Sequence, residues 1–159
     1  MFGNRESGES DLLLIAVVAA VLGIMWMFIM APSVTEARAF TDAAGALAHY
    51  CDHASCSKYS ADQDGLKRAI AQTAKLDRNA SWYRRFGASY QGSQTPHVAT
   101  LVDAGASEWT CSRIVDLGGK DLAMGTLSIN GSVYDYERPG PKHCGASKGD
   151  TISFSVAVK

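Results

Sequence analysis

The sequence predicts an α+β protein in which a long N-terminal α-helix packs on a small antiparallel β-sheet. Two observations carry this prediction. An unbroken apolar segment near the N-terminus leads directly into an amphipathic helical pattern, and the last third of the chain alternates like β-strands around an Asn-Gly turn. The chain has 159 residues and a formal net charge of −1. It therefore carries no basic excess of the kind that nucleic-acid binding needs, and we expect no nucleic-acid partner.

The apolar segment runs from Leu12 to Met30 and contains no charged or polar side chain. As a helix it spans about 28 Å, close to the hydrocarbon core of a bilayer. A cleaved secretory signal is disfavoured, because the run is long and the preceding residues carry one Arg against two Glu and one Asp. We divide the chain into residues 1–32, a leader with a hydrophobic helix that anchors the protein in a membrane, and residues 33–159, a head domain.

A second helical pattern follows the apolar segment directly. Residues 33–50 are rich in alanine and place their apolar side chains on one stripe, and Ser33 with Glu36 forms a capping-box pattern. Two residues weaken the helix between them: Gly23, and Pro32, which lacks an amide hydrogen. We expect one helix of about 40 residues, kinked or briefly broken at Pro32, that leads from the membrane into the head.

All four cysteines follow the apolar segment, which indicates two disulfides in an oxidising compartment and allows three pairings. His49, Cys51, His53 and Cys56 form a metal-like cluster, but their spacing does not match common zinc sites. We therefore favour a Cys51–Cys56 disulfide that pins this loop, with a metal site as the alternative, and expect no cofactor.

The middle of the chain predicts a second amphipathic helix over Asp64–Leu76. The stretch from Trp82 to Tyr90 is rich in aromatic residues and arginine. In a chain without a basic excess it is read as a packed loop or a lateral contact surface rather than as a platform for single-stranded nucleic acid.

The last third predicts the sheet. We expect a strand over His97–Ala104, a short helix from Ser107 that ends at Gly118-Gly119, and a hairpin turn at Asn130-Gly131. The final segment TISFSVAVK alternates as a closing strand, with four side chains pointing inward: Ile152, Phe154, Val156 and Val158. The chain has no phosphate-binding loop, no G-x-S-x-G and no H-E-x-x-H motif, and nothing in it argues for an enzyme.

This order of elements resembles a type IV pilin, in detail the type IVb class of conjugative and enteric thin-pilus systems. The resemblance is carried by five short stretches: Glu6-Ser7-Gly8, Trp109–Val115 (WTCSRIV), Leu127–Gly131 (LSING), Cys144, and Thr151–Phe154 (TISF). It implies a structural subunit that waits in the bacterial inner membrane. Pilus assembly machinery then adds it to a helical, extracellular filament of identical subunits.

The resemblance also implies roles for particular residues. Met1 would be the processed and methylated N-terminus, and Glu6, with Glu9 as second choice, the carboxylate that pairs with a neighbouring subunit's terminal amine. Gly23 would be the place where the helix loses regularity in a filament, with Pro32 as a second bend.

In this family a cysteine in a short helix bonds one near the C-terminus, which implies a Cys111–Cys144 disulfide. We expect that its loss would free the final strand. Two alternatives stay open: a minor pilin, or a monomeric membrane-anchored periplasmic component of a secretion or conjugation machine, in which Glu6 has no role.

Overall fold

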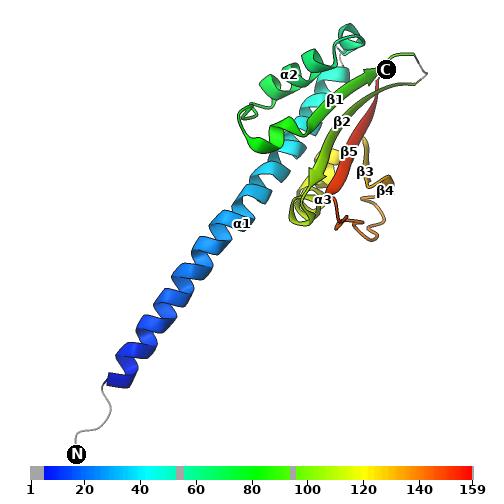
Figure 1. The fold of residues 1–159 in the computed structure, drawn as a ribbon. Coiled ribbons are helices and arrows are strands. Elements are labelled where there is room, and N and C mark those ends of the chain that lie inside the picture. The colour runs from blue at the N-terminus through cyan, green and yellow to red at the C-terminus, as the bar shows by residue number, and fades with distance from the viewer. Residues whose placement is uncertain (1–5, 53–55, 94–95, 159) are drawn as a thin grey trace, which may run out of the picture.

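The computed structural model describes residues 6–52, 56–93 and 96–158, with side chains from Leu12 onward except at residues 29–30 and 120–121. Its largest element is α1 (Glu6–Asp52), whose N-terminal half projects from the head as a free rod (Figure 1). Its C-terminal half is the spine of the head. Five side chains there are fully buried at helical spacing: Ala37, Phe40, Ala43, Ala44 and Leu47.

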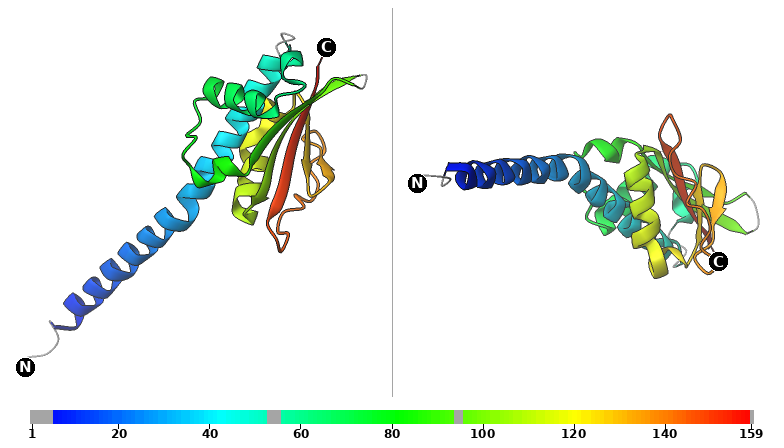
Figure 2. Two further views of the ribbon diagram at one scale, coloured as in Figure 1. Left: turned by 45° about the horizontal axis from the view of Figure 1, so that its top comes forward. Right: turned by 90° about the horizontal axis from the view of Figure 1, so that it is seen from below.

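α1 continues through Pro32, so of the two expected alternatives, a kink or a brief break, the break does not occur. Seen from below, the helix changes direction as it enters the head (Figure 2). Proline removes one amide donor and crowds the preceding turn, which bends a helix without ending it when packing holds both sides. Because no helix begins at Ser33, the expected capping box does not form, and Glu36 pairs instead with Arg85.

The two remaining helices flank α1. Helix α2 (Gln63–Thr73) starts after Asp62, whose carboxylate accepts the amide of Gly65 at 2.7 Å. Helix α3 (Glu108–Leu122) starts after Ser107, whose hydroxyl accepts the amide of Thr110 at 3.0 Å, as expected for a capping serine. Short 3₁₀ turns, η1 (Ser57–Tyr59) and η2 (Ser81–Arg84), complete the helical part.

The sheet has five strands in the order β1-β2-β5-β3-β4, and every neighbouring pair is antiparallel. The strands are β1 (Phe86–Gln91), β2 (His97–Ala106), β3 (Thr126–Ile129), β4 (Ser132–Tyr134) and β5 (Asp150–Val158). Helix α2 lies against β1, α1 against β2 and β5, and α3 against β3 and β5. The helices thus form one layer over one face of the sheet (Figure 2).

Two predictions about the late sheet are confirmed. The hairpin turn has positive φ at both central residues, 51° at Asn130 and 83° at Gly131, as a type I′ turn requires. Strand β5 buries the four side chains that were expected to point inward. It lies at the centre of the sheet, hydrogen-bonded to β2 on one side and β3 on the other.

Two elements differ from the prediction. The stretch read as a loop contains β1, an edge strand that points Phe86, Ala88 and Tyr90 inward. Its inward residues vary in size and Gly87 lies between them, which weakens the alternating signal. Helix α3 is interrupted at Gly119, with φ 28° and ψ −119°, where the sequence predicts its end, but it differs from the prediction in that helical structure resumes and continues to Leu122.

Candidate assembly surface

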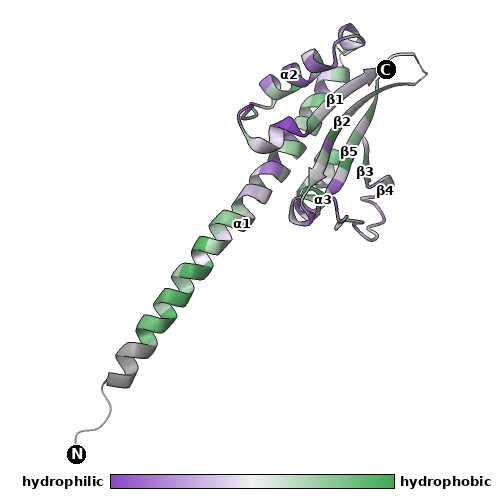
Figure 3. Ribbon diagram, viewed as in Figure 1, coloured by the Kyte–Doolittle hydropathy of each residue, from purple (hydrophilic) through white to green (hydrophobic). Residues whose placement is uncertain are grey.

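The free half of α1 exposes apolar side chains on all sides. Every large apolar residue from Leu12 to Phe28 is at least 50% exposed, and Phe28 reaches 78%. Figure 3 shows this half as a continuous hydrophobic rod that joins a mixed head. The helix is long and apolar enough to cross a membrane, and none of its most apolar stretch of 18 residues is buried inside the molecule. Such a surface needs a covering of lipid or protein.

Four predicted assembly residues lie along this rod. Glu6 and Glu9 fall in the first turn of α1, where the helix macrodipole favours acidic groups; their side chains, like Met1 as a whole, lie outside the described residues. Gly23 has no atom within 4 Å of where a Cβ would stand. Pro32 is exposed on the helix, close to the head. The monomer therefore leaves Gly23 open to close approach by another helix.

A buried ionic cluster of Arg85, Glu36 and Asp103, here called the Arg85 cluster, joins α1 to the sheet. Arg85, which directly precedes β1, binds Glu36 of α1 through Nη2 and Asp103 of β2 through Nε, the latter at 3.3 Å from Oδ1. Asp103 is fully buried and Glu36 nearly so, whereas Arg85 is half-buried. One guanidinium thus fixes the helix against the sheet just above the point where α1 leaves the head.

This cluster holds two carboxyl groups against one cation. Burial raises the pKa of Asp103 to about 7, and the adjacent Glu36 adds to the shift while Arg85 opposes it. Oδ2 of Asp103 has no hydrogen-bond partner among the described residues. A protonated Asp103 relieves the excess negative charge, so the cluster is well suited to hold one proton near neutral pH.

Both predicted disulfides are present. Cys51–Cys56 ties the end of α1 to η1, so the two thiols that the alternative metal site required are bonded to each other; His53 lies outside the described residues. Cys111 of α3 bonds Cys144 in the loop before β5.

Sequence reasoning missed a second tie on the loop before β5. The buried Asp150 carboxylate accepts hydrogen bonds from the amides of Gly145 and Ala146 and from the Asn130 side chain, at 2.9–3.0 Å. Burial alone would raise the pKa of Asp150, but these donors outweigh it and lower the pKa. The sequence offered one signal for this contact, because Asp150 begins the final strand directly after a segment that contains Gly145 and Gly149.

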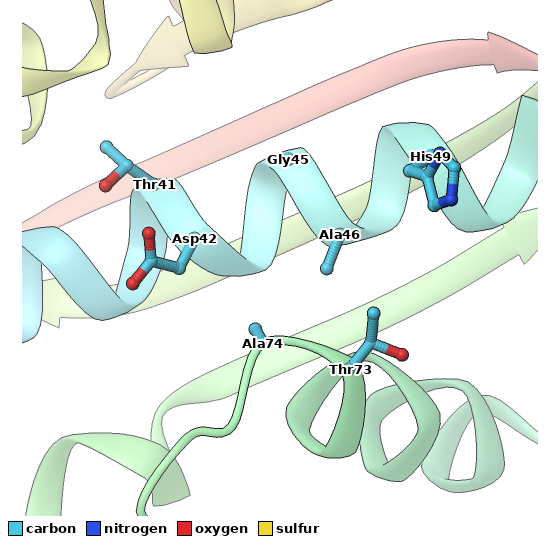
Figure 4. Close-up of a pocket in the computed structure, with 7 residues that line it drawn as sticks. All are labelled: Thr41, Asp42, Gly45, Ala46, His49, Thr73 and Ala74. Atoms are coloured by element: carbon cyan, nitrogen blue, oxygen red, sulfur yellow. The ribbon is translucent and has the colours of Figure 1, made fainter.

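A shallow hollow of about 430 Å³ lies between α1 and α2, shown in Figure 4. Its polar groups include Asp42 and His49, which stand two turns apart on α1 with Ala46 between them. A separation of seven residues corresponds to about 10 Å along a helix axis, so these two side chains are well separated along α1. The hollow offers small side chains rather than a reactive pair.

Comparisons of the chain with protein-family models, with curated proteins and with solved structures find no match. What the protein does must therefore be inferred from its own residues and their geometry.

Proposed function

We propose that this protein is the structural subunit of a type IVb-like pilus. The apolar halves of α1 bundle in the core of a helical filament, and the heads form its outer layer. Before assembly the same segment lies in the bacterial inner membrane. The role is structural and requires no catalysis. The observation that supports it most directly is the exposed apolar rod, covalently continuous with the spine of the head.

The size of the rod sets the scale of the interaction. Thirteen large apolar side chains from Leu12 to Phe28 are exposed. Burying each contributes about 1.5–3 kcal/mol relative to water, so the gross gain is roughly 20–40 kcal/mol before the costs of association. The rod is therefore covered at every stage, first by lipid and then by the helices of other copies.

The move from lipid to protein needs a different driving force, because lipid tails are as apolar as leucine. Close packing at small residues provides one part, and Ala16, Ala19, Ala20 and Gly23 offer such contacts. Charge pairing provides another, since a carboxylate taken into an apolar core needs a cationic partner. Glu6 with the terminal amine of a neighbouring copy would satisfy this need.

The continuity of α1 favours assembly over a plain membrane anchor. An anchor needs only to end at the bilayer surface, whereas here a single helix of 47 residues enters the core of the head. The Arg85 cluster further fixes the helix to the sheet. Each head is therefore held in a set direction relative to its rod, which a regular polymer of identical units requires.

The test replaces Glu6 by glutamine or alanine in cells that make the protein, with Glu9→Ala as the second candidate. Glu137→Ala serves as a matched control, because Glu137 is an exposed acid in the head. We expect Glu6 variants to reach the membrane at normal levels but to yield no filaments in electron micrographs of sheared surface material. Unchanged filaments that do not contain this chain would favour the monomeric anchor, whereas unchanged filaments that contain it would refute the role of Glu6.

The abundance of the chain in that material tests whether it is the major or a minor subunit of the filament. Mass spectrometry of the main band should identify this chain if it is the major subunit, and only as a trace if it is a minor one.

A further inference from the structure

Two of the three asparagines in the chain lie in the tripeptide Asn-x-Ser, at Asn79-Ala80-Ser81 and Asn130-Gly131-Ser132. This pattern, with any residue but proline in the middle, is the acceptor for N-linked glycosylation in exported proteins. The two disulfides indicate that the head belongs in an oxidising compartment, where such a pattern can be used. The two asparagines differ in their hydrogen bonding and in their surroundings.

Asn130 has no amide hydrogen to spare. Its Nδ2 donates to the carbonyl of His143 at 2.8 Å and to Asp150 at 2.9 Å, and its Oδ1 accepts the amide of Thr151 at 2.9 Å. The residue also sits in the tight hairpin turn with φ 51°. A sugar on Nδ2 would replace one of these N–H groups and break the contact between the hairpin and the loop before β5.

Asn79 has the opposite surroundings. It lies in the turn between α2 and η2, and Asp77, Arg78, Asn79 and Ser81 are all exposed. In the part of the chain that the structure describes, its side-chain amide makes no hydrogen bond. Its backbone N–H donates to Oδ1 of Asp77 at 2.9 Å, which fixes the turn without using the side chain.

The turn is also held firmly at its base. The amide of Ala80 donates to the carbonyl of Asp77 at 3.2 Å, and Trp82, just after the acceptor pattern, is buried in the core. The structure therefore presents Asn79 and Ser81 on a defined loop whose side chains face solvent. Asp77 also places an exposed acidic side chain two positions before the asparagine.

We propose that Asn79 is the acceptor of an N-linked glycan, delivered by a polyprenyl-diphosphate-linked oligosaccharide at the outer side of the membrane. A bond forms between Nδ2 of Asn79 and C1 of the first sugar. The bond between C1 and the diphosphate oxygen breaks, and the lipid diphosphate leaves with the electron pair. One proton of the amide passes to a base of the transferase. The sugar supplies the electrophile, so no oxidant or reductant is involved.

This modification requires that the head is exported, but not that the chain polymerises. A glycosylated chain that never forms filaments would leave the inference intact. Filaments built from an unmodified chain would overturn it and leave the proposed function standing.

The test uses the full-length protein isolated from cells that make it naturally. Trypsin releases Asn79–Arg84 as one peptide and Asp121–Lys142, which contains Asn130, as another. We expect mass spectrometry to find the first peptide heavier by whole sugar residues, with fragmentation placing the addition on Asn79. The second peptide should have its unmodified mass.

Three variants sharpen the result. Asn79→Gln and Ser81→Ala should each abolish the added mass and keep the thermal unfolding midpoint of the unglycosylated chain. Ser132→Ala is the matched control, since it destroys the other acceptor pattern while keeping Asn130, and it should leave the added mass unchanged. An unmodified Asn79–Arg84 peptide in the wild type, or sugar on Asn130, would refute the inference.

Discussion

Removing the Cys111–Cys144 disulfide should lower the stability of the head without releasing its last strand. Cys111 is fully buried in α3, and the bond closes a loop with a sequence separation of 33 residues. Replacing both cysteines by alanine removes the covalent link without leaving a buried hydroxyl. The matched control replaces Cys51 and Cys56 in the same way, across a separation of only five residues.

Loop entropy sets the expected size of the two effects. Closing a loop of 33 residues in the unfolded chain corresponds to about 3.7 kcal/mol, and closing one of five residues to about 2 kcal/mol. A domain of this size is stable by about 5–15 kcal/mol, so the first change removes a large part of that free energy. The difference between the two variants, about 1.7 kcal/mol by the same relation, is the quantity to test.

The central position of β5 in the sheet argues against the expectation that this strand would be set free. This strand is central and pairs along its length with β2 and in part with β3. The amides of Gly145 and Ala146, next to the removed disulfide, also keep their hydrogen bonds to the Asp150 carboxylate. The released freedom should therefore be confined to the loop between β4 and β5 as long as the head stays folded.

The assay is urea unfolding of the full chain in non-ionic detergent micelles, followed by near-ultraviolet circular dichroism, with amide hydrogen exchange under native conditions. We expect a lower midpoint for Cys111→Ala/Cys144→Ala than for Cys51→Ala/Cys56→Ala, and protected β5 amides in both. Equal midpoints, or rapid exchange throughout β5 in the first variant, would refute this reasoning.

Three further predictions concern single residues. Because the pKa of Asp103 is raised to about 7 from near 4 in an unfolded chain, the folded state binds the extra proton between these values. The free energy of unfolding should thus fall from pH 4 to pH 7, by at most about 4 kcal/mol, and Asp103→Asn should flatten that fall in urea titrations; an unchanged slope would contradict the assignment. Asp150→Ala should cost about 3 kcal/mol at pH 7, because it leaves buried donors unpaired. Since the pKa of Asp150 is lowered, the part of this cost that depends on its charge should be lost as pH falls through that lowered pKa, and a cost at pH 2 equal to that at pH 7 would argue for a packing effect. Gly23→Ala should leave thermal unfolding of the head unchanged but reduce filament yield, and normal yield would exclude close helix contact at Gly23.

Much of the fold followed from local sequence signals. The apolar run at Leu12–Met30, the Asn130-Gly131 turn and the alternation after Asp150 each fix an element through interactions within a few residues. These elements are present as expected. At Pro32 the local signal allowed either a kink or a brief break, and the helix stays continuous because its head side is held by packing against distant strands.

The ionic cluster lay beyond local reasoning. Glu36 and Arg85 are 49 residues apart, and nothing near Glu36 indicates its partner. Asp103 did offer a signal, since it occupies the inward face of β2 together with Ala99 and Leu101. A charged residue at such a position needs a buried counter-ion, although the sequence does not say which one. In the proposed filament the partner of Glu6 would belong to another copy of the chain, which the sequence of one copy does not reveal.

The unbroken course of α1 has a mechanical consequence. In a filament built as proposed, tension along the fibre passes from rod to rod through the bundled helices. The sheet lies to one side of the helix axis. It is joined to α1 by packing, by the Arg85 cluster and by the chain that continues from Asp52. The head is thus spared most of the load, so a pulled fibre should stretch by yielding along its helices while the sheet keeps its shape.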